Sequence, residues 1–308
     1  MTGFRVIDPG VLSLFQDVGR FGYHGLGLTN GGPLDPVSFY WANRLVGNTA
    51  NTTAIEVTLG GLSLKSEVET NIAVAGAAMQ LKINGKLKTL WRSHRIRLGD
   101  MIQLGHTSKG CRSYLAVLGG FHVEPLFGST ATIVREDMGK PIRKDQWIAC
   151  VNSESRRNLA LPFKEIPSYE KKVWLRVIPG YQYELFETTA RNSFFGTEYR
   201  VSNRHDRMGY RLEGVLIESP GSKMLSEGIC LGAIQIPADG QPIVLLNDRQ
   251  TIGGYPKIGS VLSCDLANLA QCNSGDCVQF KPTTIGAAQK ILRATKARME
   301  SIQLKVCE

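Results

Sequence analysis

The sequence predicts a mainly β protein, built from barrels or sandwiches with few helices. Short runs rich in β-branched and aliphatic residues recur along its 308 residues, separated by glycine, asparagine, aspartate and proline. Runs of this length and spacing are typical of all-β barrels and sandwiches. A hydrophobic content of 43% supports a sizeable core. The clearest predicted strands are residues 54–59, 72–75, 113–118, 175–178 and 243–246.

Two helices are expected among these strands. The first has Asp35 as N-cap and Pro36 at the first helical position, and it stops at Gly47. The second covers residues 284–304, where apolar residues recur at nearly helical spacing between lysines and arginines. This pattern favours a helix packed on the last barrel over a docking peptide.

The least structured composition lies at residues 151–172, which contain two prolines and end in a pair of lysines. Segments of this kind are typical of linkers between domains. We therefore expect two domains, residues 1–160 and residues 161–308.

The net charge of +9 has one local concentration. Between Glu69 and Asp100 there is no acidic residue, while six basic ones fall there: Lys82, Lys86, Lys88, Arg92, Arg95 and Arg97. The stretch is either a basic partner face or the solvated side of a hairpin. Residues 81–88 alternate apolar and polar about Asn84 and Gly85, which favours a hairpin with its lysines toward solvent. Since only Trp91 is an aromatic close to these charges, we expect no nucleic-acid partner.

Several other classes are disfavoured. The chain begins without an apolar signal region and has no run of about eighteen apolar residues, so we expect a cytoplasmic protein without a membrane segment. Seven scattered cysteines without a CxxC pair are typical of reduced thiols. There is no phosphate-binding loop motif and no GxGxxG motif. Five histidines lack HxH or HExxH spacing, so we expect no metal site.

The most informative segment is residues 239–256. An apolar run, Ile243 to Leu246, precedes five consecutive polar residues, 247–251, which suggests a site at a strand end. Asn247 and Gln250 each carry an amide donor and an amide acceptor, so they match a ligand with an amide, lactam or urea group. The adjacent glycines, 253 and 254, allow close approach of a ligand or another chain. The alternative is a polar connection between two strands.

Three further blocks accompany this segment. They are residues 15–48, with Phe15-Gln16-Asp17-Val18-Gly19-Arg20 and Gly31-Gly32-Pro33-Leu34-Asp35; residues 113–120; and residues 202–214. In this order the blocks resemble the family of the bacterial 5-oxoprolinase C subunit. That family also contains an antagonist of a sporulation-kinase inhibitor, allophanate hydrolase subunit 2 and part of the carboxyltransferase domain of urea carboxylase. One departure is the stretch 133–141, which has a single glycine where the family carries a glycine-rich loop.

The resemblance implies two cyclophilin-like β-barrels in tandem, over residues 1–160 and 161–308. It implies two partner proteins, similar to the B and A subunits of 5-oxoprolinase, together with ATP and Mg²⁺. The implied reaction is opening of the 5-oxoproline lactam to glutamate, with this chain inactive by itself. Two alternatives share the same blocks. One is a carboxyltransferase half that acts on urea or another amide with biotin on a separate protein, and the other is a regulatory protein that antagonises a histidine-kinase inhibitor.

The resemblance and the side-chain chemistry together define candidate site residues. We expect Asp248, Gln250 and Asn247 to be catalytic, with Asp248 as a base or a metal–nucleotide contact. Arginines in the 202–214 block are suited to phosphate or carboxylate oxygens, although strand-surface charges would look the same. We expect both blocks to share one pocket. The predicted substrate-binding residues are Asn203, Arg204, Arg207, Tyr210, Arg211, Thr251, Gly253, Gly254, Tyr255, Gln16 and Asp17.

Overall fold

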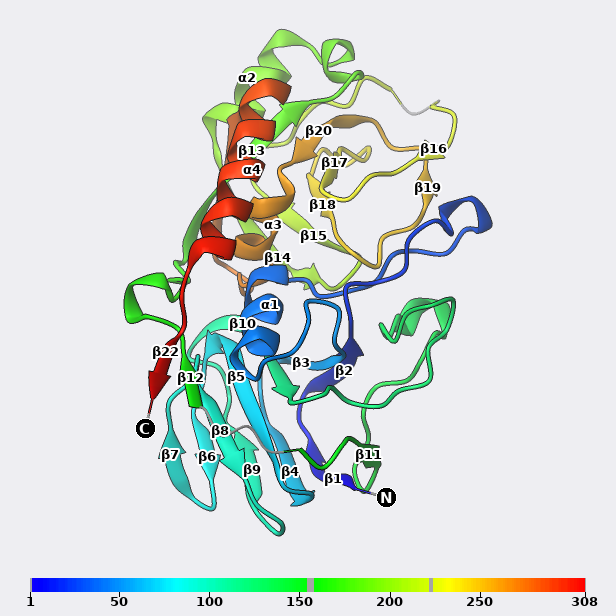
Figure 1. The fold of residues 1–308 in the computed structure, drawn as a ribbon. Coiled ribbons are helices and arrows are strands. Elements are labelled where there is room, and N and C mark those ends of the chain that lie inside the picture. Colours follow the sequence, from blue (N-terminus) through cyan, green and yellow to red (C-terminus); the bar gives the residue numbers. More distant parts are fainter. Residues whose placement is uncertain (1, 154–157, 222–223, 308) are drawn as a thin grey trace. The chain divides into compact units, whose positions relative to one another are not determined.

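The computed structural model describes residues 2–153, 158–221 and 224–307 (Figure 1). The chain divides into two compact units. Unit 1 comprises residues 1–20, 31–169 and 303–308, and unit 2 comprises residues 21–30 and 170–302. The expected linker, residues 151–172, contains the change of unit at 169, although its residues 154–157 lie outside the described part. Two short exchanges of chain between the units were not expected from the sequence. Residues 21–30 belong to unit 2, and residues 303–308 return to unit 1.

Unit 1 consists mainly of two antiparallel sheets. The six-stranded sheet has the order β11 (Trp147–Ala149), β1 (Gly3–Pro9), β4 (Leu62–Glu67), β9 (Met101–Leu104), β6 (Leu81–Ile83) and β7 (Lys86–Lys88). The five-stranded sheet has the order β2 (Leu12–Gln16), β3 (Ala54–Thr58), β10 (Lys109–Val117), β5 (Thr70–Ala78) and β8 (Ser93–Ile96). A small sheet pairs β12 (Asn158–Ala160) with β22 (Lys305–Cys307).

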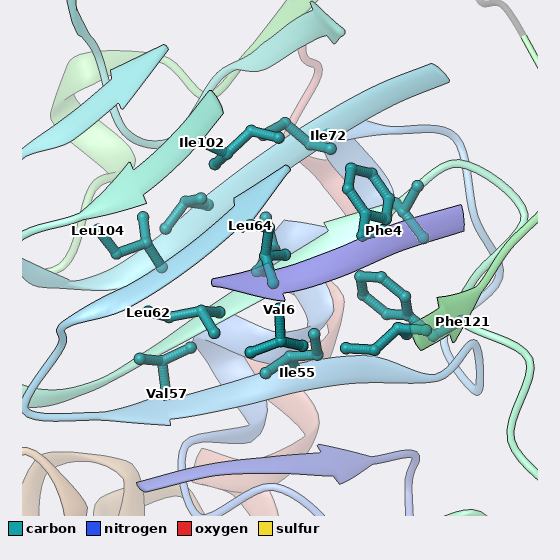
Figure 2. Packing of buried hydrophobic residues seen from close by; sticks show 14 of the residues in the cluster. Phe4, Val6, Ile55, Val57, Leu62, Leu64, Ile72, Ile102, Leu104 and Phe121 are labelled. Atoms are coloured by element: carbon teal, nitrogen blue, oxygen red, sulfur yellow. The ribbon is translucent and has the colours of Figure 1, made fainter. Parts of the chain in front are cut away.

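One hydrophobic core joins the two sheets (Figure 2). Val6 of β1 and Leu64 of β4 come from the first sheet, while Ile55 of β3 comes from the second, and all are buried. The rings of Phe4 and Phe121 meet edge to face at 6.0 Å. Each such side chain contributes about 1.5–3 kcal/mol when fully buried. The alternation of buried and exposed residues along β4 follows from this one-sided packing.

The predicted helix start in unit 1 is confirmed. Helix α1 (Pro36–Leu45) has Asp35 as its N-cap, whose Oδ1 accepts hydrogen bonds from the backbone N–H groups of Val37 at 3.1 Å and Ser38 at 3.0 Å. These bonds satisfy donors that a helix cannot satisfy internally. Short 3₁₀ turns occur at η2 (Val134–Glu136) in the glycine-poor stretch and at η3 (Phe163–Glu165).

Unit 2 contains a closed barrel. Its strand order is β13 (Lys172–Pro179), β20 (Lys257–Val261), β17 (Ala233–Gln235), β18 (Ile243–Leu245), β15 (Gly209–Glu213), β14 (Glu198–His205) and β21 (Cys277–Pro282). The parallel pair of β13 and β21 completes the ring, so no edge of this sheet is left open. A separate short ladder pairs β16 (Glu227–Gly228) with β19 (Ile252–Gly253).

The helices of unit 2 are α2 (Thr188–Gly196), α3 (Ser263–Ala270) and α4 (Ile285–Ser301), with 3₁₀ turns η1 (His24–Leu26) and η4 (Tyr183–Leu185). The long helix predicted near the C-terminus is α4, and Thr284 caps it. Only Ala288 of α4 is buried, and Ile285 is 64% exposed, so the helix packs less tightly than its apolar spacing suggests. No helix in the described ranges is long and apolar enough to span a membrane.

The mainly β prediction is confirmed, and the five strands expected from the sequence coincide with β3, β5, β10, β13 and β18. The barrel closes in unit 2, whereas unit 1 holds its strands in two sheets about a shared core.

Candidate functional site

The polar segment of residues 247–251 lies directly after β18, at the end of a barrel strand. Backbone bonds fix it to the turn between β14 and β15: Leu246 N donates to Met208 O at 2.8 Å, and Asp248 N donates to Arg207 O at 3.0 Å. The segment then leads into β19, which carries Gly253. Because a polar turn directly follows the short strand β18, the side chains of residues 247–251 gather at one end of this strand in unit 2.

Asp248 and Arg207 form a buried bidentate ion pair. Nε of Arg207 donates to Oδ2 at 2.9 Å and Nη2 donates to Oδ1 at 3.0 Å. The residues are 4% and 7% exposed. This pair therefore joins the sequence block of residues 202–214 to the segment of residues 239–256. Because both carboxylate oxygens are engaged, proton transfer by Asp248 would require the pair to open, and its catalytic role stays a prediction.

Arg249 is a buried guanidinium with neutral acceptors. It is 3% exposed, and its donors reach the backbone oxygens of Ile229 at 3.1 Å and Leu246 at 3.2 Å. A third bond goes to Oδ1 of Asn30, at 3.4 Å, from the segment that unit 2 gains at residues 21–30. No carboxylate in the described part of the chain pairs with it. Burial lowers the pKa of Arg249, and the neighbouring Cys230 thiol partly offsets this, but an arginine stays protonated.

A buried unpaired cation is costly, so its presence points to an anionic group that binds there. The residue that follows Ile229, Cys230, is exposed. Arg249 therefore has the properties expected of an anion-binding residue.

On the other side of Ile229 lies a group of two amides and a glycine, which we call the amide cluster: Gln235, Gln250 and Gly253. A Cβ placed on Gly253 would lie 3.1 Å from Nε2 of Gln235 and 3.5 Å from Nε2 of Gln250. Gln235 is 1% exposed, and its Nε2 has no acceptor among the described residues. Ile229 connects the two features, because its Cδ1 would lie 2.6 Å from that Cβ while its backbone holds Arg249. A glycine is required at 253 to leave this space open.

A charged network borders the amide cluster. Lys257 of β20 pairs across the sheet with Gln235 of β17, and Glu227 of β16 pairs with Gly253 of β19. The Lys257 ammonium forms an ion pair with Glu227, which also accepts hydrogen bonds from Tyr181 and from Gln182. Lys257 and then Tyr181 lower the pKa of Glu227. The ammonium of Lys257 thus comes from the residue paired with Gln235, and the neutral Tyr181 phenol binds the same Glu227 carboxylate.

A separate hollow of about 720 Å³ opens on the other side of this segment. It is lined by Gly254, Tyr255 and Pro256, together with Leu216, Glu218 and Asp239. Neither Arg249 nor the amide cluster lines it. The two predicted glycines therefore serve different surfaces, since residue 253 lies by the amides and residue 254 by the hollow.

Other predicted site residues of unit 2 lie elsewhere. Tyr210 is fully buried, and its hydroxyl donates to backbone oxygens of Ala270 and Cys272, so it serves the barrel interior. Arg211 forms an ion pair with Asp239 near the hollow. The two remaining members of that block, Asn203 and Arg204, are exposed on β14. Thr251 is half-buried, and its backbone oxygen accepts from Ile229 N beside the amide cluster.

Gln16 and Asp17 belong to unit 1. Nε2 of Gln16 donates to Thr132 O at 3.1 Å. The Asp17 carboxylate accepts from Ser129 Oγ at 2.6 Å and from Thr130 N at 2.8 Å, which fastens the 129–130 turn. In the structure, both side chains therefore hold loops of unit 1.

Sequence reasoning missed four residues of this region: Arg249, Gln235, Lys257 and Glu227. Arg249 stood within the polar run, but nothing in the sequence showed that it is buried and that its acceptors in the described part of the chain are all neutral. The other three come from β17, β20 and β16, and only the pairing of distant strands brings them together. A signal was available for Gln235, a single amide within the otherwise apolar run 233–236.

Comparison with known proteins identifies the family. The family model described as carboxyltransferase domain, subdomain A and B, matches residues 26–282, so the chain belongs to this family. It is 33% identical over 295 residues to the C subunit of 5-oxoprolinase from Escherichia coli strain K12, with 93% of each chain covered. The C subunit of the Haemophilus influenzae enzyme is 30% identical, with 98% of each chain covered.

Larger relatives contain the same fold. Urea amidolyase of Saccharomyces cerevisiae is 27% identical over 98% of this chain, which spans 18% of that protein. The crystal structure of Kluyveromyces lactis urea carboxylase superposes with a TM-score of 0.90 at 27% identity, covering 98% of this chain and 29% of that one. These matches confirm the resemblance inferred from the sequence blocks.

Proposed function

We propose that this chain is the substrate-binding subunit of an ATP-dependent 5-oxoprolinase, a hydrolase complex that opens the 5-oxoproline lactam to glutamate. Its partners in this proposal are proteins similar to the B and A subunits of that enzyme. One observation carries it: the buried Arg249 guanidinium, with only neutral acceptors among the described residues, is joined through Ile229 to a pair of side-chain amides.

The substrate chemistry matches these groups. 5-Oxoproline has a lactam, which offers one N–H donor and one carbonyl acceptor, and a carboxylate. The Gln235 and Gln250 amides are complementary to the lactam, while Arg249 is complementary to the carboxylate. Lys257 is placed to stabilise negative charge that develops on the lactam oxygen, and Glu227 keeps its ammonium oriented. In this assignment Asp248 positions Arg207, and Gln250 contacts substrate.

The described residues do not fit a nucleotide with Mg²⁺. The sequence has no phosphate-binding loop, and no group of three His, Cys, Asp or Glu side chains converges within the described ranges. We therefore assign ATP to another component of the complex and derive no step on this chain from it. The chain by itself is then expected to be almost inactive.

The second candidate is a carboxyltransferase half that acts with biotin on a separate protein. The names of the urea carboxylase relatives favour it, and the two amides would match urea as well as a lactam. Urea is neutral, however, and gives Arg249 no anionic partner. A third candidate, a regulatory protein that antagonises a kinase inhibitor, has no support from this site.

Ligand binding by the complex of this chain with its B-like partner separates these candidates. Calorimetry would compare 5-oxoproline, 2-pyrrolidinone, which lacks the carboxylate, and urea. We expect 5-oxoproline to bind most tightly. Arg249→Gln should weaken 5-oxoproline binding about 10- to 100-fold and leave 2-pyrrolidinone almost unchanged, since a hydrogen bond to a charged group contributes about 1.5–3 kcal/mol.

Arg293→Gln, at an exposed position of α4, is the matched control and should leave all three ligands unaffected. Tighter binding of urea than of 5-oxoproline, or unchanged 5-oxoproline affinity in Arg249→Gln, would overturn the proposal.

A further inference from the structure

Unit 1 contains a second hollow, of about 620 Å³, which the proposed function does not use. We call it the basic groove. It extends from β7 at the end of the six-stranded sheet to β8 at the end of the five-stranded sheet. Its lining includes five lysines and arginines: Lys86, Lys88, Arg92, Arg95 and Arg97.

The two sheet ends differ in what covers them. The start of β8 is covered by β12, because Arg92 bridges to Ala160 and Leu159 N donates to Ser93 Oγ at 2.7 Å. In contrast, β7 pairs only with β6 within the described residues. The free edge at the groove is therefore that of β7.

The hairpin geometry determines which backbone groups β7 presents. Asn84 and Gly85 have φ values of 51° and 75°, as in a type I′ turn, and Ile83 pairs with Lys86 next to it. Since the pair closing a two-residue hairpin is hydrogen-bonded, the next pair, Lys82 with Leu87, is not. The N–H and C=O groups of Leu87 consequently point away from β6, toward the free edge.

The charge around this edge is strongly positive. Asp100 is the single acidic residue that lines the groove, and its oxygens already accept from Asn84 Nδ2 at 2.7 Å and from Arg97 N at 2.8 Å. Arg95 has a half-exposed pairing with Glu69 at 3.8 Å. Lys86, Lys88 and Arg97 form no ion pair with the described residues, and Asp100 is already engaged, so this part of the groove is complementary to a negatively charged occupant.

We propose that the basic groove docks an extended acidic segment of a partner protein, which adds to the free edge of β7 as a further strand. Backbone groups of Leu87 pair with the segment, and its acidic side chains lie against the cations. The Leu87 side chain, 65% exposed, offers an apolar contact to alternate residues. Lysines alone also protect an edge strand from pairing. Such protection does not explain why further cations from the β8 side enclose a hollow opposite that edge.

The test uses fluorescence anisotropy with the full chain and a labelled heptapeptide of alternating glutamate and valine. We expect measurable binding that weakens as salt is raised. Lys86→Gln/Lys88→Gln should weaken it about tenfold or more. The control removes two exposed charges from α4, Lys290→Gln/Arg293→Gln, and should have no effect.

Strand addition is tested separately from charge. Leu87→Pro removes the outward N–H without breaking a bond to β6, so it should weaken binding well beyond Leu87→Ala. A peptide with a central proline should bind at least about tenfold more weakly than the parent peptide. Circular dichroism verifies that each variant is folded.

Two results would overturn the proposal. If inorganic tripolyphosphate displaces the peptide and the proline-containing peptide binds as well as the parent, the groove is a site for small anions. If the acidic peptide does not bind at low salt, the lysines only protect an edge strand.

Discussion

Replacing Asp248 by Asn separates a structural from a catalytic role for this carboxylate. In the structure both oxygens of Asp248 accept from Arg207, at 2.9 and 3.0 Å, and both residues are almost fully buried. The amide of asparagine keeps one acceptor but loses the charge. One charge-assisted hydrogen bond is lost, at about 1.5–3 kcal/mol, and the buried guanidinium loses the negative charge of this partner. We therefore expect the variant to lose about 3–5 kcal/mol of unfolding free energy.

The assay is urea denaturation followed by tryptophan fluorescence. With a slope of about 2 kcal/mol per molar urea, the expected loss moves the midpoint down by about 1.5–2.5 M. The matched control is Asp239→Asn, which breaks the more exposed pair with Arg211 and should cost no more than about 1 kcal/mol.

Activity is then measured as ATP-dependent glutamate release by the reconstituted complex, at a temperature where the variant is fully folded. A stability loss below about 1 kcal/mol together with an activity loss of about 100-fold or more would refute the structural reasoning. Asp248 would then be assigned to proton transfer, as expected from the sequence.

Three further predictions concern the same region. An aromatic disulfide reagent should modify exposed Cys230 first in the native chain, and Cys230→Ser should remove that fast phase, while Cys150, whose pKa burial raises to about 12, should react only after unfolding. Gly253→Ala places a methyl group against the side chains of the amide cluster. Calorimetry should therefore show that ligand binding is lost under conditions where the melting temperature shows that the variant is folded. The lowered pKa of Glu227, caused first by Lys257, stabilises the fold above the ordinary carboxylate pKa and is lost as the pH falls through the lowered value. The melting-temperature difference between wild type and Glu227→Gln should therefore shrink between about pH 6 and about pH 3, and a constant difference would contradict it.

The sequence by itself determined the features that depend on local patterns. Alternating and short apolar runs predicted the strands, because a strand buried on one or both faces needs apolar residues at a spacing that the chain shows directly. Asp35 and the Asn84–Gly85 pair predicted a cap and a hairpin turn for the same reason, since capping and turn geometry involve neighbouring residues only. The polar run after Ile243–Leu246 also predicted a group of polar residues at a strand end.

The tertiary structure alone decided how those polar residues are used. Asp248 is engaged by Arg207, forty-one positions away, while the buried Arg249 has only neutral acceptors among the described residues, and neither fact has a local signature. Gln235 and Lys257 join the site because β17 pairs with β20, and a pairing register between separate strands is set by the packing of the whole barrel. For the same reason, the sequence predicted the hairpin of residues 81–88, whereas only the fold brings its Lys86 and Lys88 together with the arginines at 92, 95 and 97 around a groove.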